Sequence, residues 1–222
     1  MRAVVFDFDG VLVDSEPLHF QALRESLLPE GIAIGREEYY GRYLAYDDRG
    51  AIRLALEHHG LPRDVGRIEA VAARKARIFE RRLRQVSFFP GAREIVRSLA
   101  REVPLAIASG ARHEEIEAIL TAGGLREAFR AIVGAEDVTQ GKPHPEPYLR
   151  AVAQLAAATP GLEPPQCLAF EDSAPGVAAA LAAGMKVVAV TNSYPAAKLS
   201  AAHRVVDSLV GLGNDGLRDL FG

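Results

Sequence analysis

The sequence predicts an α/β fold: an open parallel β-sheet with helices on both faces, interrupted early by a helical insertion. Three observations lead to this prediction. Short, nearly continuous apolar segments recur along the chain, as in parallel strands buried on both faces. Helical patterns separate the later segments, so that strand and helix alternate. Residues 16–86 break this alternation, because they carry helical periodicity and no strand pattern.

The expected strands are short runs of Val, Ile, Leu, Ala and Phe. They cover residues 2–7, 104–109, 131–135, 166–172, 186–190 and 204–206, of which the last is the weakest. Between them, apolar residues spaced three or four apart predict helices. These helices cover residues 91–100, 113–124, 146–158 and 174–183.

The long stretch after the first strand is interpreted as an inserted domain. A βαβ crossover needs only about 10–12 residues, so residues 16–86 are far too many for one connection. Their periodicity predicts about four helices. We therefore expect a core domain of residues 1–15 and 87–222 and an inserted helical domain of residues 16–86.

Composition excludes several classes of protein. The 222 residues carry 26 basic and 29 acidic side chains, a net charge of −3, which does not favour a nucleic-acid partner. No apolar stretch reaches the ~18 residues of a membrane span, and the N-terminus lacks a signal-peptide pattern. Cys167 is the single cysteine and is expected to be a core residue, so no internal disulfide forms. We expect a cytoplasmic monomer.

Polar side chains follow four of the predicted strands at the point where each ends. In an open α/β sheet this edge binds ligands. The residues are Asp7 and Asp9, Ser109 with Gly110, Lys142, and Glu171 with Asp172. Clustered carboxylates repel one another unless a cation lies among them. Lys142 supplies one positive charge, and Mg²⁺ with a bound phosphate would complete the balance.

At this point the four motifs resemble those of the haloacid dehalogenase-like superfamily. They are DFDGVLVD (7–14), ASG (108–110), GKPHPEPY (141–148) and EDSAPGV (171–177), in the order of that superfamily. Within it, the chain is most similar to the β-phosphoglucomutase-like (CbbY-like) group, in which a helical cap is inserted after the first motif. The resemblance implies a Rossmann-like core with residues 16–86 as the cap.

The resemblance also implies a role for each core residue. Asp7 would be the nucleophile that forms an aspartyl-phosphate, and Asp9 the general acid and base. Mg²⁺ would be held by the Asp7 carboxylate, the Asp9 backbone carbonyl and Asp172, with Glu171 in or next to the outer shell of the metal. Ser109 and Lys142 would hold the transferring phosphoryl group. Backbone N–H groups around Phe8, Asp9 and Gly10 can line the same cradle, and Gly110 is a further candidate for substrate binding.

Three residues of the insertion are candidates for substrate binding. The resemblance places His19, Lys75 and Arg49 at or near cap positions that face the substrate, although Arg49 stands in a different local pattern, YDDRGA. Each also has an ordinary structural interpretation. His19 could be a core histidine, and Lys75 belongs to a basic run that could form a solvated helix face.

The function that these residues predict is that of a Mg²⁺-dependent phosphatase acting on a small phosphorylated metabolite, with a sugar phosphate as one candidate. A phosphomutase is the alternative, since it differs only in the acceptor of the phosphoryl group. A phosphonate hydrolase would need a Schiff-base lysine, for which Lys75 is the one candidate in the insertion. A non-enzymatic binding module is disfavoured, because every motif residue is present.

Overall fold

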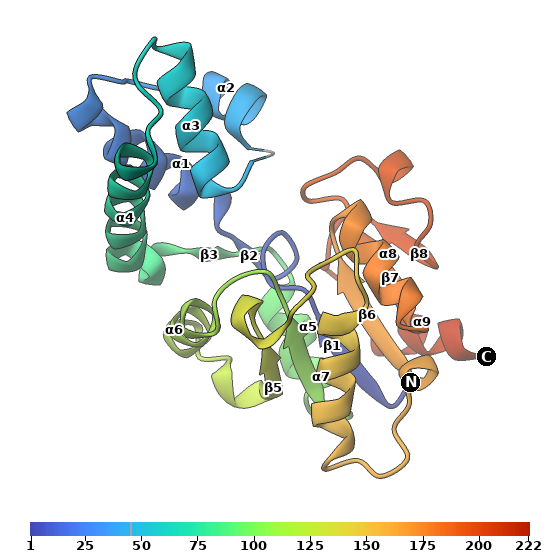
Figure 1. Cartoon of the computed structure of the whole chain (residues 1–222). Coiled ribbons are helices and arrows are strands. Elements are labelled where there is room, and N and C mark those ends of the chain that lie inside the picture. The colour runs from blue at the N-terminus through green and yellow to red at the C-terminus, as the bar shows by residue number, and fades with distance from the viewer. Residues whose placement is uncertain (45) are drawn as a thin grey trace. The chain divides into compact units, whose positions relative to one another are not determined.

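The computed structural model describes residues 1–44 and 46–222, apart from the side chain of Arg84. The chain forms two compact units. One consists of Met1–Asp14 and Ser87–Gly222 and is called here the core unit; the other, Ser15–Val86, is called the helical unit. Figure 1 shows the two units, each of which is described by itself.

The core unit contains the predicted parallel sheet, which is confirmed. Its strands are β1 (Ala3–Phe6), β4 (Leu105–Ala108), β5 (Phe129–Val133), β6 (Cys167–Glu171), β7 (Lys186–Val190) and β8 (Arg204–Val206). All neighbours pair in parallel, in the order β5-β4-β1-β6-β7-β8. The chain therefore adds β4 and then β5 on one side of β1, and then β6, β7 and β8 on the other side. In such a sheet the strand order reverses beside β1, and ligands bind at the carboxyl ends there.

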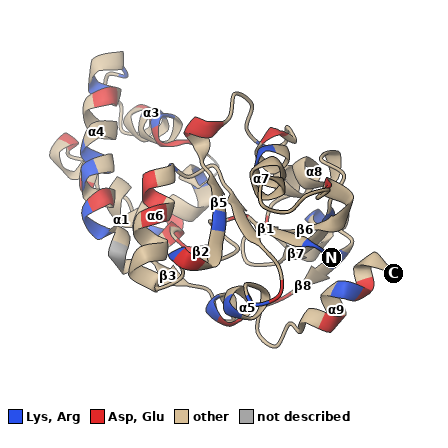
Figure 2. Cartoon of the chain, turned by 90° about the horizontal axis from the view of Figure 1, so that it is seen from below, with Lys and Arg blue, Asp and Glu red and all other residues tan. Residues whose placement is uncertain are grey.

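Helices cover both faces of this sheet. They are α5 (Ala92–Leu99), α6 (His113–Gly123), α7 (Glu146–Ala156), α8 (Ala174–Ala182) and α9 (Asn214–Arg218). Figure 2 shows the sheet between α7 and α8 on one side and α5 and α9 on the other. Alternate strand residues, among them Ala3, Ala106 and Ala169, form one buried cluster with Tyr148 of α7 and Val177 of α8. Small side chains on these strands let α7 and α8 pack closely on the sheet. Because α7 follows β5 and α8 follows β6, the N-terminal turns of both helices lie toward the carboxyl edge of the sheet.

A second, two-stranded sheet was not expected from the sequence. β2 (Val13–Asp14) pairs with β3 (Ser87–Phe88) in antiparallel fashion, with Val13 opposite Phe88. The two strands carry the chain to and from the helical unit. Two-residue strands have no periodicity of their own, and so no sequence pattern could indicate them.

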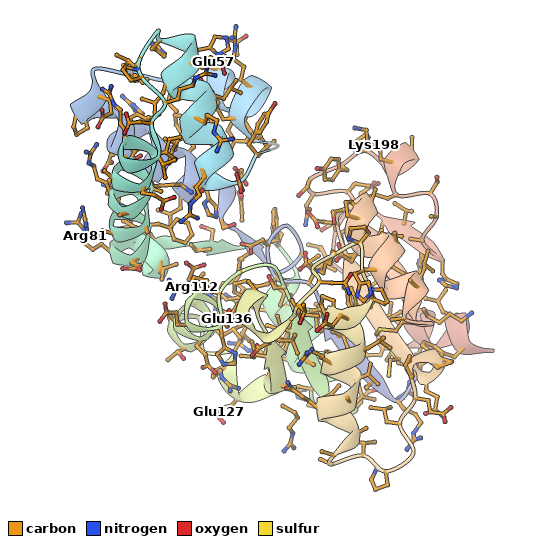
Figure 3. The ribbon with its side chains drawn as sticks, viewed as in Figure 1. Glu57, Arg81, Arg112, Glu127, Glu136 and Lys198 are labelled. Atoms are coloured by element: carbon orange, nitrogen blue, oxygen red, sulfur yellow. The ribbon has the colours of Figure 1, made fainter. Side chains whose placement is uncertain are left out.

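The helical unit contains α1 (Glu16–Leu27), α2 (Arg36–Glu38), α3 (Asp48–His58) and α4 (Val65–Arg82), with a π-helical turn at Tyr39–Tyr43. Asp47 and Asp64 cap α3 and α4, since their carboxylates accept hydrogen bonds from Gly50 N and Arg67 N. Figure 2 shows basic residues recurring along α4, and Figure 3 shows Arg81 pointing away from that helix. The apolar faces of α1, α3 and α4 form a separate buried cluster.

Among the described residues, none of the helices combines the length and apolarity that crossing a membrane requires.

Candidate functional site

The predicted residues of the core unit lie together at the carboxyl edge of the sheet. Asp7 follows β1, and its N–H donates to Phe170 O of β6 at 2.9 Å. Ser109 follows β4, and its N–H donates to Val133 O of β5 at 3.0 Å. Both residues therefore continue the ladder by one step, and their side chains are fixed at the end of a buried sheet. Asp7, Ser109 and Asp172 are buried although all three are polar.

Lys142 joins two of these segments. Its Nζ donates to Asp7 Oδ1 at 2.8 Å and to Glu171 Oε1 at 2.6 Å. Burial works to lower the pKa of Lys142, but attraction by Asp7 and Glu171 outweighs it, and the pKa is raised. The ammonium is therefore charged across the physiological pH range. A lysine has three N–H donors, so one is left to bind a phosphate oxygen.

Glu171 is held by the protein at both carboxylate oxygens. Oε1 accepts hydrogen bonds from Lys142 Nζ and from the Tyr148 hydroxyl, the latter at 2.7 Å. Oε2 accepts from the backbone N–H groups of Asp172 and Ser173 and from Ser173 Oγ, at 3.0, 3.2 and 3.1 Å. The lone pairs of this carboxylate are thus largely occupied. The geometry favours a role in anchoring Lys142, and the predicted place of Glu171 near a metal stays a prediction.

The backbone near Glu171 is shaped to admit its carboxylate. A Cβ at Gly176, in the first turn of α8, would come within 1.9 Å of Glu171 Oε1. Burial opposes ionisation of Glu171, but Lys142 and the hydrogen bonds from Lys142 and Tyr148 bring its pKa below the usual range. Glu171 is therefore a charged, buried anchor.

Tyr148 is a site residue that sequence reasoning missed. It is fully buried in the first turns of α7, six residues after Lys142, and its ring lies 5.0 Å from Lys142 Nζ. Burial and the neighbouring Glu171 raise its pKa well above the usual value, so the phenol stays a hydrogen-bond donor. The motif GKPHPEPY ends on this residue, but the sequence alone could not show that its hydroxyl meets Glu171.

We predict that Tyr148→Phe destabilises the protein by about 2 kcal/mol, because it removes a buried hydrogen bond to a charged group. We also expect a several-fold lower turnover, since Glu171 loses a partner that orients it beneath Lys142. Tyr43→Phe is the matched control: Tyr43 also donates to a glutamate, Glu38 Oε1 at 2.9 Å, but in the helical unit. Denaturant unfolding and initial rates of both variants check the prediction. Equal turnover in the two variants would contradict the role in the site.

Three carboxylates form a compact acidic cluster. Asp7, Glu171 and Asp172 each offer an oxygen, and these oxygens lie within 4.8 Å of one another. Burial raises the pKa of Asp7 well above its usual range despite the attraction of Lys142. Burial also raises the pKa of Asp172 to about 6, and the charges of Glu171 and Asp9 act in the same direction. Lys142 alone therefore does not offset the negative charge.

A divalent cation fits this cluster. Two buried carboxylates whose ionisation is disfavoured, Asp7 and Asp172, are hard oxygen donors of the kind that Mg²⁺ takes together with water. The turn after β1 can approach these carboxylates because residue 10 is a glycine. Its φ is +78°, and a Cβ at this position would lie only 1.9 Å from Asp172 Oδ2. The sequence places glycine where the backbone must approach a carboxylate.

Ser109 and Gly110 form the opposite side of the site. Ser109 Oγ accepts a hydrogen bond from Ala111 N at 3.0 Å, which leaves its proton to be donated to a ligand oxygen. The N-terminus of α6 is capped by a side chain from another segment. His113 N donates to both oxygens of Glu136, which is labelled in Figure 3, at 3.0 and 3.2 Å. Gly110 has no side chain, so only its backbone could serve the predicted role in substrate binding. A Cβ at this position would meet nothing within 4 Å.

The helical unit brings together two of its three predicted site residues. Lys75 of α4 lies 3.0 Å from His19 Nδ1 of α1 and forms an ion pair with Asp48 of α3. Lys75 is only 3% exposed, whereas none of the other described basic side chains between Arg63 and Arg82 is buried, so Lys75 does not belong to a solvated face. The His19 ring stacks on Phe79 with centroids 4.3 Å apart. Arg49 instead forms an exposed two-pronged ion pair with Glu69 at 2.6 and 2.9 Å.

His19 is neutral at physiological pH in this cluster. Burial and the neighbouring Lys75 lower its pKa to about 4, against the opposing effect of Asp48. Because Nδ1 accepts from the Lys75 ammonium, the ring carries its proton on Nε2. The pair thus presents a neutral N–H donor beside a buried ammonium.

We predict that this histidine makes the protein less stable in acid. The unfolded histidine, with a pKa of about 6.5, takes up a proton before the folded one does. Its contribution is therefore intact above pH ~6.5 and is lost as the pH falls toward 4, by up to about 3 kcal/mol. The difference in unfolding free energy between wild type and His19→Gln, measured from pH 8 to pH 4, isolates this effect. A difference that does not change with pH would contradict it.

The comparisons with known proteins identify the family. The haloacid dehalogenase-like hydrolase family matches residues 1–184 of the 222. The chain belongs to this family. As a member of the haloacid dehalogenase-like hydrolases it is an enzyme, either a hydrolase or a phosphomutase.

Relatives support the same placement. Protein CbbY of Rhodobacter capsulatus is 34% identical over 204 residues, which cover 87% of each chain. Hexitol phosphatase B of Escherichia coli (strain K12) is 33% identical over 192 residues, which cover 85% of this chain and 82% of the relative. The crystal structure of a putative β-phosphoglucomutase from Thermotoga maritima is similar with a TM-score of 0.76 at 30% identity, covering 93% of this chain and 94% of that one. The resemblance to the β-phosphoglucomutase-like group is thereby confirmed.

Proposed function

We propose that the protein is a Mg²⁺-dependent phosphatase that hydrolyses a small phosphorylated metabolite, with a sugar phosphate as the substrate class. One observation carries the proposal. Lys142 Nζ lies between Asp7 Oδ1 and Glu171 Oε1, at 2.8 and 2.6 Å, beside a carboxylate cluster that could hold a metal ion. This arrangement suits a phosphate dianion bound between an ammonium, a metal ion and the Ser109 hydroxyl. The relatives' names, which include a hexitol phosphatase, support the substrate class.

In the proposed reaction Asp7 attacks phosphorus. A bond forms between a carboxylate oxygen of Asp7 and phosphorus while the ester P–O bond breaks, and Asp9 donates a proton to the departing oxygen. Water then attacks the phosphoryl group, Asp9 accepts its proton, and the Asp7–phosphorus bond breaks to release inorganic phosphate. Lys142 and Ser109 hold the phosphoryl oxygens in both steps, which keeps the attacking and leaving oxygens in line.

The Asp7 and Asp172 carboxylates and the Asp9 backbone carbonyl would hold Mg²⁺, which when bound neutralises charge on the phosphoryl oxygens. The residues of the helical unit are proposed as a cap that selects the rest of the substrate. His19, as a neutral N–H donor, and Lys75, as an ammonium, suit the hydroxyl groups of a phosphorylated sugar. Arg49 pairs with Glu69 through Nε and Nη2 and is proposed as a third residue that binds the substrate.

We expect phosphate release from p-nitrophenyl phosphate and from a panel of hexose, pentose and hexitol phosphates in Mg²⁺, and none in EDTA. Restoring Mg²⁺ should restore the rate, since the folded carboxylate cluster is preserved. Turnover that persists in EDTA after dialysis would contradict the metal dependence. Absence of phosphate release from every ester would contradict the phosphatase.

A phosphomutase is the second candidate, and the structural likeness to a putative β-phosphoglucomutase favours it. It would transfer the phosphoryl group from Asp7 to a second hydroxyl of the sugar instead of to water. Isomerisation of a sugar 1-phosphate that requires a catalytic amount of the bisphosphate and releases no phosphate would identify it.

A further inference from the structure

A fifth segment of the core unit reaches the carboxylate cluster, from a strand that none of the four motifs includes. The loop Thr191–Tyr194, with the sequence TNSY, directly follows β7 and is called here the β7 loop. β7 pairs with β6, which carries Glu171, so the loop leaves the sheet next to the acidic pair. Sequence reasoning applied the rule about strand ends to four other segments and not to this one.

The β7 loop makes one contact to each of the two segments that carry the proposed metal ligands. The Ser193 hydroxyl lies beside the Asp172 carboxylate, since a Cβ placed on Gly10 would meet both Asp172 Oδ2 and Ser193 Oγ. Asn192 Nδ2 donates to Gly10 O at 2.8 Å, in the turn that follows Asp9. The two segments, at Gly10 and Asp172, lie more than 160 residues apart in the chain. The loop links them, because Asn192 reaches the backbone of one and Ser193 lies beside the side chain of the other.

The loop is itself anchored on the far side. Thr191 N donates to Val206 O at 3.0 Å, and Thr191 Oγ1 donates to Asp207 Oδ1 at 3.2 Å, both at the end of β8. Ser193 therefore extends from a fixed backbone. Its Oγ would lie 2.8 Å from a Cβ placed on Gly10, so hydroxyl, turn and Asp172 meet at one point.

We propose that the β7 loop positions the metal site, with the Ser193 hydroxyl orienting the Asp172 carboxylate and the Asn192 amide holding the Gly10 turn. The inference rests on the proposed function in so far as that function places a divalent metal on Asp7 and Asp172. A hydrogen bond to one oxygen of a carboxylate fixes the direction of the other, and such partners of metal ligands typically change metal affinity by 10- to 100-fold when they are removed.

Both residues act through others, so they are positioning residues. Removing them should weaken metal binding while leaving turnover at saturating metal largely intact. This separates them from Asp7 and Asp9, whose loss removes a reacting group. It also separates them from a merely structural role, which would lower thermal stability without a specific effect on metal affinity.

The test measures Mn²⁺ binding to the full chain by electron paramagnetic resonance, with no substrate present. We expect Ser193→Ala and Asn192→Ala each to raise the dissociation constant 10- to 100-fold and Ser193→Thr to stay within threefold of wild type. Ser200→Ala is the matched control, because the exposed Ser200 hydroxyl donates to Ala197 O, three residues earlier, at 3.1 Å. Melting of the metal-free variants should follow wild type, and the Mg²⁺ needed for half-maximal turnover should rise in parallel with the Mn²⁺ constants.

Dissociation constants within threefold of wild type in both alanine variants would overturn the inference and leave the phosphatase proposal standing. Weakened Mn²⁺ binding in variants of a wild type that hydrolyses no phosphate ester would have the opposite meaning: the loop positions the metal and the proposed function is wrong. A wild type that binds no Mn²⁺ would overturn both.

Discussion

Replacing Asp7 with Asn is expected to lower phosphate release from p-nitrophenyl phosphate by on the order of 10⁴-fold or more, because the amide cannot attack phosphorus. The side chain changes by one atom, so shape is preserved. Asp7 is buried beside Lys142, where an Asn oxygen can still accept the 2.8 Å hydrogen bond that Asp7 Oδ1 accepts. The variant should therefore fold, but it lacks the nucleophile and one charged ligand of the proposed metal site.

Asp215→Asn provides the control for the Asp7 variant. It makes the same chemical change at an exposed position of α9, in the same unit. We expect it to match wild type in rate and in circular dichroism. An Asp7→Asn variant that keeps even a tenth of the wild-type rate would contradict the assignment of Asp7 as the nucleophile.

Lys142→Met is expected to have the second-largest effect, and on two properties at once. It leaves Asp7 and Glu171 buried without their cation, which should cost about 3–5 kcal/mol of stability in the metal-free protein. It also removes a donor to the phosphoryl group, which should lower turnover by about 10²- to 10³-fold. Lys198→Met, at an exposed lysine labelled in Figure 3, should change neither property.

A double variant separates the two effects of Lys142. Adding Glu171→Gln to Lys142→Met removes one of the two buried charges that the single variant leaves unpaired. We expect the double variant to regain at least half of the lost stability and none of the lost turnover. Urea unfolding and initial rates measure the two properties. A Lys142→Met variant as stable as wild type would contradict the buried ion pair.

The sheet is predictable because its strands are buried on both faces. Each of the six strands overlaps an expected apolar run, and β5 differs most, beginning at Phe129 instead of 131. The alternation of strand and helix then determines that the strands are parallel and that their carboxyl ends lie together. For this reason the strand pattern alone is enough to assign Asp7, Ser109 and Glu171 to one edge of the sheet.

The residues that sequence reasoning missed depend on register and rotamer. Tyr148 and Ser193 follow the same strand-edge logic, but no pattern shows that a tyrosine in a helix or a serine in a loop lies beside a particular carboxylate. In the insertion, helical periodicity predicted α1 and α4 but not which side of α4 faces α1. Lys75 therefore looked like one member of a basic run, whereas the structure buries it against His19.

The most direct test of the proposed mechanism looks for the phosphoryl group on Asp7. The Asp9→Asn variant is used with p-nitrophenyl phosphate, whose leaving group needs little protonation, so the first step proceeds while water attack is slowed. Acid quenching traps the intermediate, and borohydride then reduces an aspartyl-phosphate at position 7 to homoserine. Peptide mass spectrometry detects the homoserine. We predict a burst of one p-nitrophenolate per protein and homoserine at position 7. Steady release without a burst, and an unmodified Asp7 after reduction, would contradict the mechanism.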